Sequence, residues 1–508
     1  MVIATIASGT REELLGLPKG AWLIVGIEFW ERFSFYAMLG LLALFLTGNV
    51  ARGGFGWADP KALGLVGLYS GLMYALPAFG GWIADRVLGR RRALTLGLML
   101  MLTGQILMTS PFFIPVILGA MHGAPLVDAL RGLGQPLGYL FRTAEINSVL
   151  AARGVQLDAA QGVGWLKQAY QLTAIGFYSA IACLVAGNSL MKSTLVVLCG
   201  ETFRIDDPRR DSAFTYYYLG ICIGGVISGL VVGLVAEAFG WAYAFSLAVV
   251  GVTVALIAYR ALATRLLGSI GVAPERRPAA HPSVNLHELV QKNTDRLILL
   301  GFLALILLVF SAGWFQLYGV WTLFIERQVD RAIGSFSVPV PWFASWNPAV
   351  VIIFAPLVAR LYERLGRQGR SPDIVQKYFL ALGLLATAHV LMYLASTIAQ
   401  GGALAPLWIP TAAIGLTAIG ELVAWTSTYG LVTRAAPEGY ASATMGAWYF
   451  MTLGLGGYLA GVPGGWLVTL GFGGTFLVIA AIAAIVAVLC LSLRGPLKRL
   501  ANRAEVTL

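Results

Sequence analysis

Charged side chains are scarce in this chain of 508 residues, because only 12% of its residues are Asp, Glu, Lys or Arg and 58% are hydrophobic. A water-soluble domain carries about a quarter of charged residues, so soluble enzymes and nucleic-acid-binding domains are excluded as classes. The mean hydropathy is +0.78, and apolar runs of about 20 residues, long enough to cross a ~30 Å hydrocarbon core, recur along the sequence. The composition therefore predicts an all-α polytopic membrane protein.

Cysteine and histidine are also few, with four of each. The cysteines lie in or beside apolar runs, which is typical of small buried side chains and not of a disulfide framework. The histidines lack the spacing of a zinc site. The sequence contains no HExxH motif, nucleophile elbow or phosphate-binding loop. We therefore expect neither a metal nor a cofactor, and no enzymatic activity.

Apolar runs and the polar breaks between them predict about twelve membrane-spanning helices. The expected spans are residues 21–47, 63–84, 93–118, 172–198, 212–238, 240–266, 297–325, 343–363, 377–398, 403–434, 441–468 and 470–494.

A polar linker at residues 267–296 divides these spans into two sets of six. We therefore expect an N-terminal bundle at 21–266 and a C-terminal bundle at 297–494, between a cytoplasmic N-terminus at 1–20 and a cytoplasmic tail at 495–508. Two such bundles, related by pseudo-symmetry, are typical of secondary transporters, whose substrate site lies between them near the midplane.

Basic residues gather in alternate loops, which predicts the orientation of the chain. The loops after the second, fourth, sixth and eighth spans are basic, and the loops after the fifth, ninth and eleventh spans carry almost no basic residue. Because cytoplasmic loops of membrane proteins are enriched in Lys and Arg, both termini are expected in the cytoplasm. The net charge of +11 thus reflects topology and not nucleic-acid binding. The basic residues are Arg86, Arg90, Arg91 and Arg92; Arg204, Arg209 and Arg210; Arg276 and Arg277; and Arg364, Arg367, Arg370 and Lys377.

Residues 119–171 form an unusually long connection on the expected outer side. Charged residues are mixed with apolar ones there, a pattern that is too polar to span the bilayer but suits amphipathic helices at its interface. We favour a role in packing; a lid over the outer entrance is the alternative.

The first predicted span contains ionisable residues that cost at least ~2.5–3.5 kcal/mol each at the centre of a membrane helix. Glu28, Glu31, Arg32 and Tyr36 are spaced i, i+3, i+4 and i+8, so they share one helix face. Two carboxylates and one guanidinium leave a negative excess, which requires another cation or a proton.

Two further ionisable residues lie in other spans. Lys192 in the fourth span is the candidate cation, and Glu421 stands in the otherwise apolar tenth span. Ion pairs that only stabilise the bundle are one interpretation. The functional interpretation is that the carboxylates change protonation as their partners move, while Arg32 binds a substrate carboxylate and Glu421 a substrate ammonium. Such a site is complementary to a zwitterion such as a short peptide.

Several motifs resemble the proton-dependent oligopeptide transporter (POT) family of the major facilitator superfamily. The first-span sequence EFWERFSFY at 28–36 is similar to the E-x-x-E-R-F-x-Y-Y signature of that family. Further matches lie at residues 80–92, 187–192, 206–212, 347–348, 420–422, 445–449 and 458–461.

The resemblance implies a major facilitator fold of two six-helix bundles, here without the extra helix pair that many bacterial members carry between the halves. It implies that proton coupling and its salt bridges involve Glu28, Glu31, Arg32 and Lys192. The residues that it implies for substrate binding are Arg32, Tyr36, Tyr69, Tyr74, Lys192, Asn347, Glu421 and Trp448. For Tyr69 and Trp448, packing is a strong alternative, and for Asn347 a hydrogen bond at a helix kink is about equally expected.

The loop after the second span contains Asp85, Arg86 and Arg90, which resemble the loop between spans two and three of the superfamily. An Asp–Arg network there is expected to act as a cytoplasmic latch between the two bundles. The simpler interpretation is that the arginines only hold the loop inside.

Three departures from the family pattern concern the expected site. Leu39 replaces a second arginine, Cys222 replaces an asparagine in the fifth span, and Phe315 replaces an acidic residue in the seventh.

The resemblance predicts a proton-coupled symporter that imports di- and tripeptides by alternating access. A carrier of another zwitterionic or amphipathic small molecule is the first alternative, and a non-transporting membrane sensor is the second. The expected partners are small peptides, protons and the lipid bilayer. We expect a monomeric, multi-pass protein of the cell membrane, specifically a bacterial inner membrane.

Overall fold

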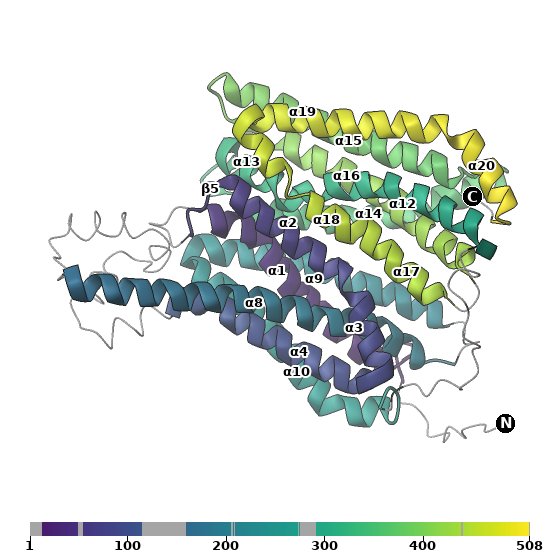
Figure 1. Ribbon diagram of the computed structural model, residues 1–508, viewed down its shortest axis with the longest axis horizontal. Coiled ribbons are helices and arrows are strands. Elements are labelled where there is room, and N and C mark those ends of the chain that lie inside the picture. The colour runs from purple at the N-terminus through teal and green to yellow at the C-terminus, as the bar shows by residue number, and fades with distance from the viewer. Residues whose placement is uncertain are drawn as a thin grey trace.

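The protein is described here from a computed structural model, and it folds into a bundle of long helices (Figure 1). The structure describes residues 13–48, 54–113, 159–204, 207, 209–272, 274, 291–437 and 440–506. Helices of the N-terminal half, drawn from purple to teal, occupy one side of the view, and those of the C-terminal half, drawn from green to yellow, occupy the other. The expected division into two halves is visible in this arrangement.

The N-terminal half is built around α1 (Lys19–Thr47), which packs against α9 (Arg209–Phe239) and α10 (Trp241–Leu267). α2 (Asp59–Ala75) continues through α3 (Pro77–Ile83) and the π-helical segment η2 (Ala84–Leu88). Gly89, with φ +77°, then turns the chain into α4 (Arg90–Met108), which packs along α8 (Ala159–Glu201). Such a left-handed backbone conformation is accessible to glycine at little cost.

The C-terminal half is also built from long helices. Its elements are α12 (Thr294–Trp314), the 3₁₀ segment η4 (Phe315–Tyr318), α13 (Val320–Gln328), α14 (Val340–Arg367), α15 (Ile374–Gln400), α16 (Trp408–Ala435), α17 (Ala441–Tyr449), the π-helical segment η5 (Phe450–Gly454), α18 (Leu455–Leu459), α19 (Pro463–Ser492) and α20 (Arg494–Arg503). The central helix α15 packs against both α16 and α19.

Eleven helices within the described residues are long and apolar enough to cross a membrane, against about twelve expected. The difference arises at the predicted span 441–468, which is divided into α17, η5, α18 and the first turns of α19. Gly471, at φ +65°, interrupts α19 near the start of the last predicted span, 470–494. The twelfth apolar segment is therefore present, but it is helical in short pieces.

Short strands join helix ends without forming a layer. β1 (Glu13–Leu14) pairs antiparallel with β2 (Leu17–Pro18), and β4 (Ala332–Ile333) with β5 (Phe336–Ser337). β3 (Val329–Asp330) pairs parallel with β6 (Ala405–Pro406), so that Val329 faces Ala405. These pairs fix connections at the ends of the bundle.

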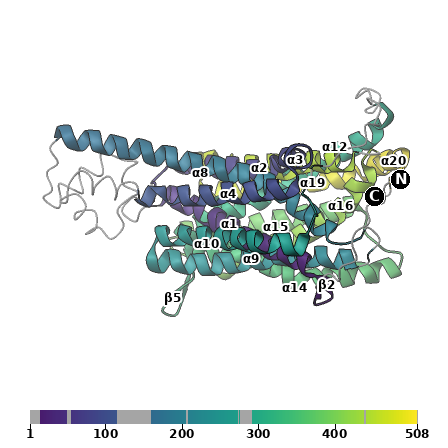
Figure 2. The ribbon, with the colours of Figure 1, turned by 90° about the horizontal axis from the view of Figure 1, so that it is seen from below.

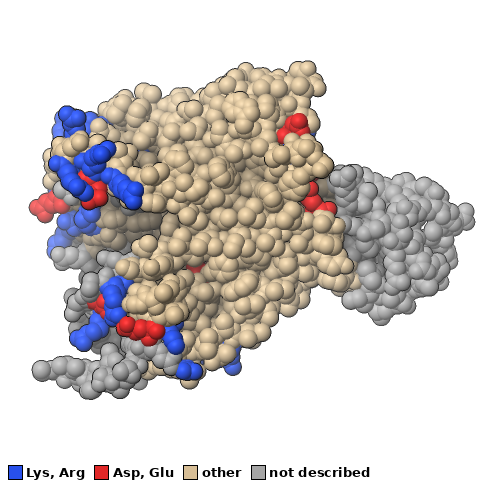
Figure 3. Space-filling view, turned by 180° about the vertical axis from the view of Figure 1, so that it is seen from behind, with Lys and Arg blue, Asp and Glu red and all other residues tan. Residues whose placement is uncertain are grey.

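Lys and Arg side chains gather at one end of the molecule, while the middle of the surface is nearly free of charge in this view (Figure 3). β2 and α20 lie at this end as well (Figure 2). We call it the basic end, and we call the opposite end, where α13 and β5 lie in Figure 1, the far end. The pattern is the one expected from the alternate basic loops; that the basic end faces the cytoplasm stays a prediction.

The segment expected as a cytoplasmic tail forms α20, which packs on the bundle through Leu497 and Leu500. Arg494 Nη2 and Lys498 Nζ lie 2.8 and 3.1 Å from Asp373 Oδ2. Asp373 also caps the N-terminus of α15, where its side chain accepts a hydrogen bond from the Gln376 backbone N–H. One carboxylate thus holds two helices together at the basic end.

Only part of the expected outer insertion 119–171 is described. Its last residues belong to α8, which begins at Ala159 and projects beyond the bundle at the far end (Figure 1). They therefore continue the fourth span instead of forming a separate interfacial helix. Residues 114–158, which would form most of the lid, lie outside the described residues. Residues 275–290, where an extra helix pair between the halves would lie, are also outside them.

The two halves meet along a glycine-rich line of contact between α2 and the segment η5–α18, which we call the glycine seam. A Cβ atom added at Gly67 would lie 2.7 Å from the Gly461 backbone nitrogen, and one added at Gly71 would lie 2.8 Å from the Gly454 oxygen. Small residues allow membrane helices to approach this closely, because their packing depends on van der Waals contact. The seam therefore brings backbone against backbone across the two halves.

Gly67→Ala is expected to destabilise the protein by about 1–3 kcal/mol, because the new methyl group meets backbone atoms that cannot turn away. Thermal unfolding of the purified protein in detergent measures the effect. Gly64→Ala is the matched control, because a Cβ at Gly64, one turn earlier in α2, meets nothing within 4 Å. Equal melting temperatures for the two variants would contradict the close approach at the seam.

Candidate functional site

The ionisable residues of α1 form a buried network. Arg32 contacts Glu31 through two nitrogens, with Nη2 donating to Glu31 Oε1 at 2.6 Å and Nε donating to Oε2. Arg32 Nε also lies 3.4 Å from Glu28 Oε1. Both glutamates are fully buried, and Arg32 is 2% exposed. The shared helix face predicted from the sequence spacing is thus observed.

Lys192 of α8 completes this network, as the negative excess of α1 required. Its Nζ donates to Glu28 Oε1 at 3.0 Å, across 164 residues of sequence. Tyr217 of α9 donates its hydroxyl to the other oxygen, Glu28 Oε2, at 2.6 Å. The Lys192 side chain retains 25% exposure, so this cation is the member of the network that reaches open space.

Asn188 and Phe35 fix the position of Arg32. Asn188 Oδ1 accepts a hydrogen bond from Arg32 Nη2 at 3.3 Å, and Asn188 Nδ2 donates to the Met73 carbonyl at 2.7 Å. On the other side, the guanidinium lies 4.5 Å from the centre of the Phe35 ring, a cation–π arrangement. Phe35 stands where the family signature E-x-x-E-R-F-x-Y-Y has its first tyrosine, and its ring contacts the arginine.

The C-terminal half contributes Glu421 of α16. Its Oε2 accepts a hydrogen bond from Trp314 Nε1 at 3.0 Å, and its side chain is half-buried. Within the described part of the chain Glu421 forms no ion pair with Lys or Arg. It is therefore the carboxylate of the site that lacks a basic partner.

Aromatic rings fill the space between the α1 network and Glu421. The Tyr36 and Tyr318 rings are stacked at 6.4 Å, and Tyr74 meets Phe315 edge-on at 5.8 Å. Tyr74 lies within electrostatic range of both Arg32 and Glu421. The two charged groups thus face one region, lined by tyrosines from both halves.

Besides Arg32, three residues implied for substrate binding are nearly inaccessible. Tyr69 is 1% exposed, Trp448 3% and Asn347 3%. Tyr69 and Trp448 belong to the main hydrophobic core, which agrees with the packing alternative for both. By contrast, Tyr36, Tyr74 and Lys192 are half-buried and reach the region between the halves.

The departures from the family pattern are all apolar contacts here. Leu39 is 1% exposed and lies in the core. Cys222 is buried in a small cluster with Val350, Val351, Ala418 and Leu422 that joins the two halves. Phe315 packs against Tyr74 and Trp314. None of the three positions supplies a polar group to the site.

Four contributors were missed at the sequence level: Asn188, Tyr217, Trp314 and Tyr318. Asn188 precedes Lys192 by four residues, and this spacing would have placed both on one helix face. Tyr217 and Trp314 carry no such signal, because their roles depend on how α9 and α12 are placed beside α1 and α16. In the described residues, no group of three His, Cys, Asp or Glu is arranged to hold a metal ion.

A family model for the POT family matches residues 91–266 and 279–470. The chain belongs to the POT family. It is 25% identical to dipeptide and tripeptide permease A of Salmonella typhimurium, over 87% of this chain and 84% of the relative. It is 23% identical to an uncharacterized transporter, YclF, of Bacillus subtilis, over 87% of each chain.

Solved structures share the fold of this POT family member. It matches a crystal structure of a variant of the peptide transporter POT in complex with sulfate with a TM-score of 0.78 and 21% identity, covering 97% of this chain and 98% of the other. It also matches a POT family transporter in complex with 5-aminolevulinic acid, with a TM-score of 0.75 and 19% identity, over 96% and 98% of the chains. The major facilitator fold expected from the motifs is confirmed.

The predicted cytoplasmic latch of this POT family member joins helices of one half. Arg90 Nε lies 2.9 Å from Asp85 Oδ1, and Arg90 Nη1 contacts Glu201 Oε1. Asp85 lies in η2, Arg90 begins α4 and Glu201 ends α8, so these contacts connect the second, third and fourth spans. The Arg86 guanidinium lies 5.9 Å from the Trp82 ring, also within this half. Among the described residues, these contacts brace the N-terminal bundle, and a latch between the two bundles stays a prediction.

Ion pairs between the halves occur at the far end instead. Arg327 of α13 binds Asp59 of α2 through two hydrogen bonds of 2.8 Å each. Arg331 Nη1 lies 3.0 Å from Glu237 Oε1 of α9. Together with the glycine seam, these pairs hold the far end closed.

Along α9 and α14, the halves touch from the far end to the middle and then separate. Ser345 donates a hydrogen bond to the Gly225 carbonyl at 3.2 Å, and Cys222 packs on Val351. Closer to the basic end, most of α14 is exposed, and so is Tyr218 at 46%. These contacts therefore hold α9 and α14 of this POT family member together from the far end to the middle of the bundle.

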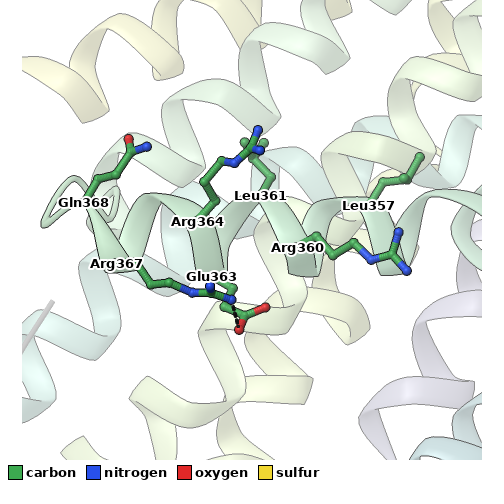
Figure 4. Close-up of a pocket in the computed structure, with 7 residues that line it drawn as sticks. All are labelled: Leu357, Arg360, Leu361, Glu363, Arg364, Arg367 and Gln368. Carbon is green, nitrogen blue, oxygen red and sulfur yellow. Dashed lines mark hydrogen bonds and ion pairs between the residues drawn. The ribbon is translucent and has the colours of Figure 1, made fainter.

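A surface cavity of about 620 Å³ lies elsewhere, at the basic end of α14 (Figure 4). It is lined by Leu357, Arg360, Leu361, Glu363, Arg364, Arg367 and Gln368, all from this helix. Arg367 turns toward Glu363, at 2.5 Å. The cavity is separate from the site between the halves.

Arg327→Gln is expected to increase the population that is open at the far end, because the variant loses the bidentate pair with Asp59. An exposed pair contributes about 1 kcal/mol or less, so the ratio of the two states should change by up to about fivefold. Spin labels on the exposed Ala58 and Ala332, one in each half, report the change as a longer distance by electron resonance.

Arg367→Gln is the matched control for this measurement, since its ion pair with Glu363 lies within one helix. The control should leave the distance distribution unchanged. An Arg327→Gln distribution that is identical to that of the unmodified protein would show that the pair does not hold the far end closed.

Proposed function

We propose that this protein is a proton-coupled symporter that imports di- and tripeptides by alternating access. The observation that carries the proposal is the buried network of Glu28, Glu31, Arg32 and Lys192, because it links α1 to α8 at the site between the halves. Relatives named dipeptide and tripeptide permease, in Salmonella typhimurium and Escherichia coli, support the peptide assignment.

The network suits proton coupling because its charges balance while both carboxylates are ionised. Protonation of Glu28 would leave Lys192 without its partner, and protonation of Glu31 would do the same to Arg32. An unpaired charge in apolar surroundings is strongly unfavourable. Binding of a proton is therefore coupled to a movement of the cation, which in turn changes the packing of α1 against α8.

The substrate would bind between the halves, among Tyr36, Tyr74 and Tyr318, with its ammonium group near Glu421. Closure at the far end and opening at the basic end describe one state of the cycle. In the opposite state the Asp59–Arg327 and Glu237–Arg331 pairs would separate while the basic end closes. Movement of the halves about a fixed midplane site is the general scheme for such transporters.

The cellular setting is part of the proposal. The basic end would face the cytoplasm, with both termini on that side, and the protein would lie in a bacterial inner membrane as a monomer. The inward proton gradient would drive net import of the substrate, since one charge that moves through a membrane potential of 100 mV releases about 2.3 kcal/mol. We propose no enzymatic step and no cofactor.

Glu28→Gln and Glu31→Gln test the proposal in liposomes that contain the purified protein. Each variant retains the size of the side chain but no longer binds a proton, so exchange of labelled dialanine should persist while accumulation driven by the proton gradient is lost. Glu363→Gln is the matched control, because this glutamate lies on the surface of α14 and, among the described residues, its ion pair is with Arg367 of the same helix. It should retain both exchange and accumulation.

Two outcomes would reject the assignment. Gradient-driven accumulation that survives in both variants would show that these carboxylates do not couple protons to transport. Failure of the unmodified protein to take up dialanine, or to be inhibited by any peptide mixture, would reject peptides as the substrate. In that case a panel of other zwitterionic and amphipathic molecules tests the first alternative, and ligand binding without any flux would favour a sensor.

A further inference from the structure

We propose that α14 carries a binding site for an anionic phospholipid at its basic end, in which Arg360 and Arg364 bind the phosphate and Leu357 contacts an acyl chain. The site is the cavity of about 620 Å³ on this helix (Figure 4). It is separate from the region between the halves, so the inference goes beyond the transport function proposed above and does not depend on it.

The cavity carries an excess of positive charge. Three arginines and one glutamate line it, which is three positive charges against one negative charge, a net charge of +2. Arg367 is paired with Glu363. Among the described residues, Arg360 and Arg364 form no ion pair with a carboxylate. Because a guanidinium group matches the geometry of a phosphate, these two arginines are suited to an anionic group that comes from outside the protein.

Apolar side chains share the helix face of Arg364. Leu357, Leu361 and Arg364 are spaced i, i+4 and i+7, which places them on one face of α14. Figure 4 shows these three side chains on the same side of the helix, while the pair of Glu363 and Arg367 lies along the other side. Both leucines are 51% exposed. The face thus combines accessible apolar surface with a cation.

The order of these groups along α14 matches the order of groups in a lipid. Toward the middle of the helix the exposed apolar surface continues through Ile353 and Phe354. Leu357 then precedes Arg364 by about 10 Å along the helix axis, at 1.5 Å per residue. In a bilayer the headgroup layer begins where the hydrocarbon core of ~30 Å ends. A phosphate at the arginines would therefore place its acyl chains beside the apolar residues.

The open side of the cavity also favours a lipid over a free anion. The residues that line it all belong to α14, so the ligand must cover the exposed leucines from outside the bundle. Inorganic phosphate could bind the two arginines, but it would leave Leu357 and Leu361 uncovered. Basic pockets at the ends of membrane helices are suited to anionic lipid headgroups.

A purely topological role for the two arginines makes a different prediction. Basic residues at the end of a span hold that end in the cytoplasm wherever they stand on the helix surface. Other exposed arginines would then attract anionic lipid equally well. A binding site at the cavity predicts instead that the affinity for anionic lipid depends on Arg360 and Arg364 more than on other exposed arginines.

Native mass spectrometry of the full-length protein in a neutral detergent measures the binding of dioleoylphosphatidylglycerol, with dioleoylphosphatidylcholine as the zwitterionic comparison. One basic residue near an anionic lipid contributes about fivefold to binding. The double variant Arg360→Gln/Arg364→Gln should therefore bind phosphatidylglycerol about five- to thirtyfold more weakly. Its affinity for phosphatidylcholine, which has no net charge, should change by less than about twofold.

The matched control is the double variant Arg92→Gln/Arg499→Gln. Both arginines are exposed, and neither forms an ion pair within the part of the chain that the structure describes. The control removes the same charge but preserves the cavity, so phosphatidylglycerol should bind less than about twofold more weakly. Equal losses of affinity in the two double variants would overturn the site and leave the topological role. Thermal unfolding without added lipid verifies that both variants are folded.

Two further measurements separate a lipid from a free phosphate. Inorganic phosphate and glycerol 3-phosphate carry the anionic group without acyl chains, so neither should displace phosphatidylglycerol when added at the same concentration as the lipid. Leu357→Gln should weaken phosphatidylglycerol binding by about threefold, because an acyl chain loses apolar contact. Displacement by either soluble anion, or an unchanged affinity in Leu357→Gln, would overturn the lipid assignment.

Discussion

The structure depends on one constraint: a charge buried away from water must keep a partner of opposite sign. Glu28 and Glu31 are fully buried in α1, and each is neutralised by one cation, Lys192 or Arg32. Because Lys192 comes from α8, this requirement joins the first and fourth spans at the centre of the bundle. The same requirement makes the network responsive to a proton, since neutralising one carboxylate releases its cation.

Two kinds of contact between the halves follow different physical rules. The glycine seam brings backbones together and depends on shape, so it resists any added atom. The far-end pairs of Asp59 with Arg327 and of Glu237 with Arg331 lie in partly exposed positions, where ion pairs are weak and easily exchanged for water. The glycine seam permits little change, whereas the far-end ion pairs separate readily. This combination suits two halves that remain associated while one end of the molecule opens.

The site is asymmetric in charge. Its N-terminal side is neutral because every cation there already has a carboxylate partner, whereas its C-terminal side presents Glu421 with a hydrogen bond from Trp314 but no ion pair. Relative to the family pattern, Leu39 removes a positive charge from the N-terminal side and Phe315 removes a negative charge from the C-terminal side, so both departures reduce the charge difference between the two sides. The chain thus retains Glu28, Glu31 and Arg32 of the first-span family signature, while Leu39 and Phe315 differ from the family pattern.

The sequence by itself determined the spans, the division into halves and the shared face of Glu28, Glu31 and Arg32, because hydropathy and helical periodicity are local properties. It also indicated Lys192 as the missing cation, by charge balance. Only the tertiary structure decided that Tyr217 binds Glu28, that Trp448 and Tyr69 are core residues and that Asp85 pairs with Arg90. These outcomes depend on how helices separated by many residues pack together, and no local pattern encodes that packing.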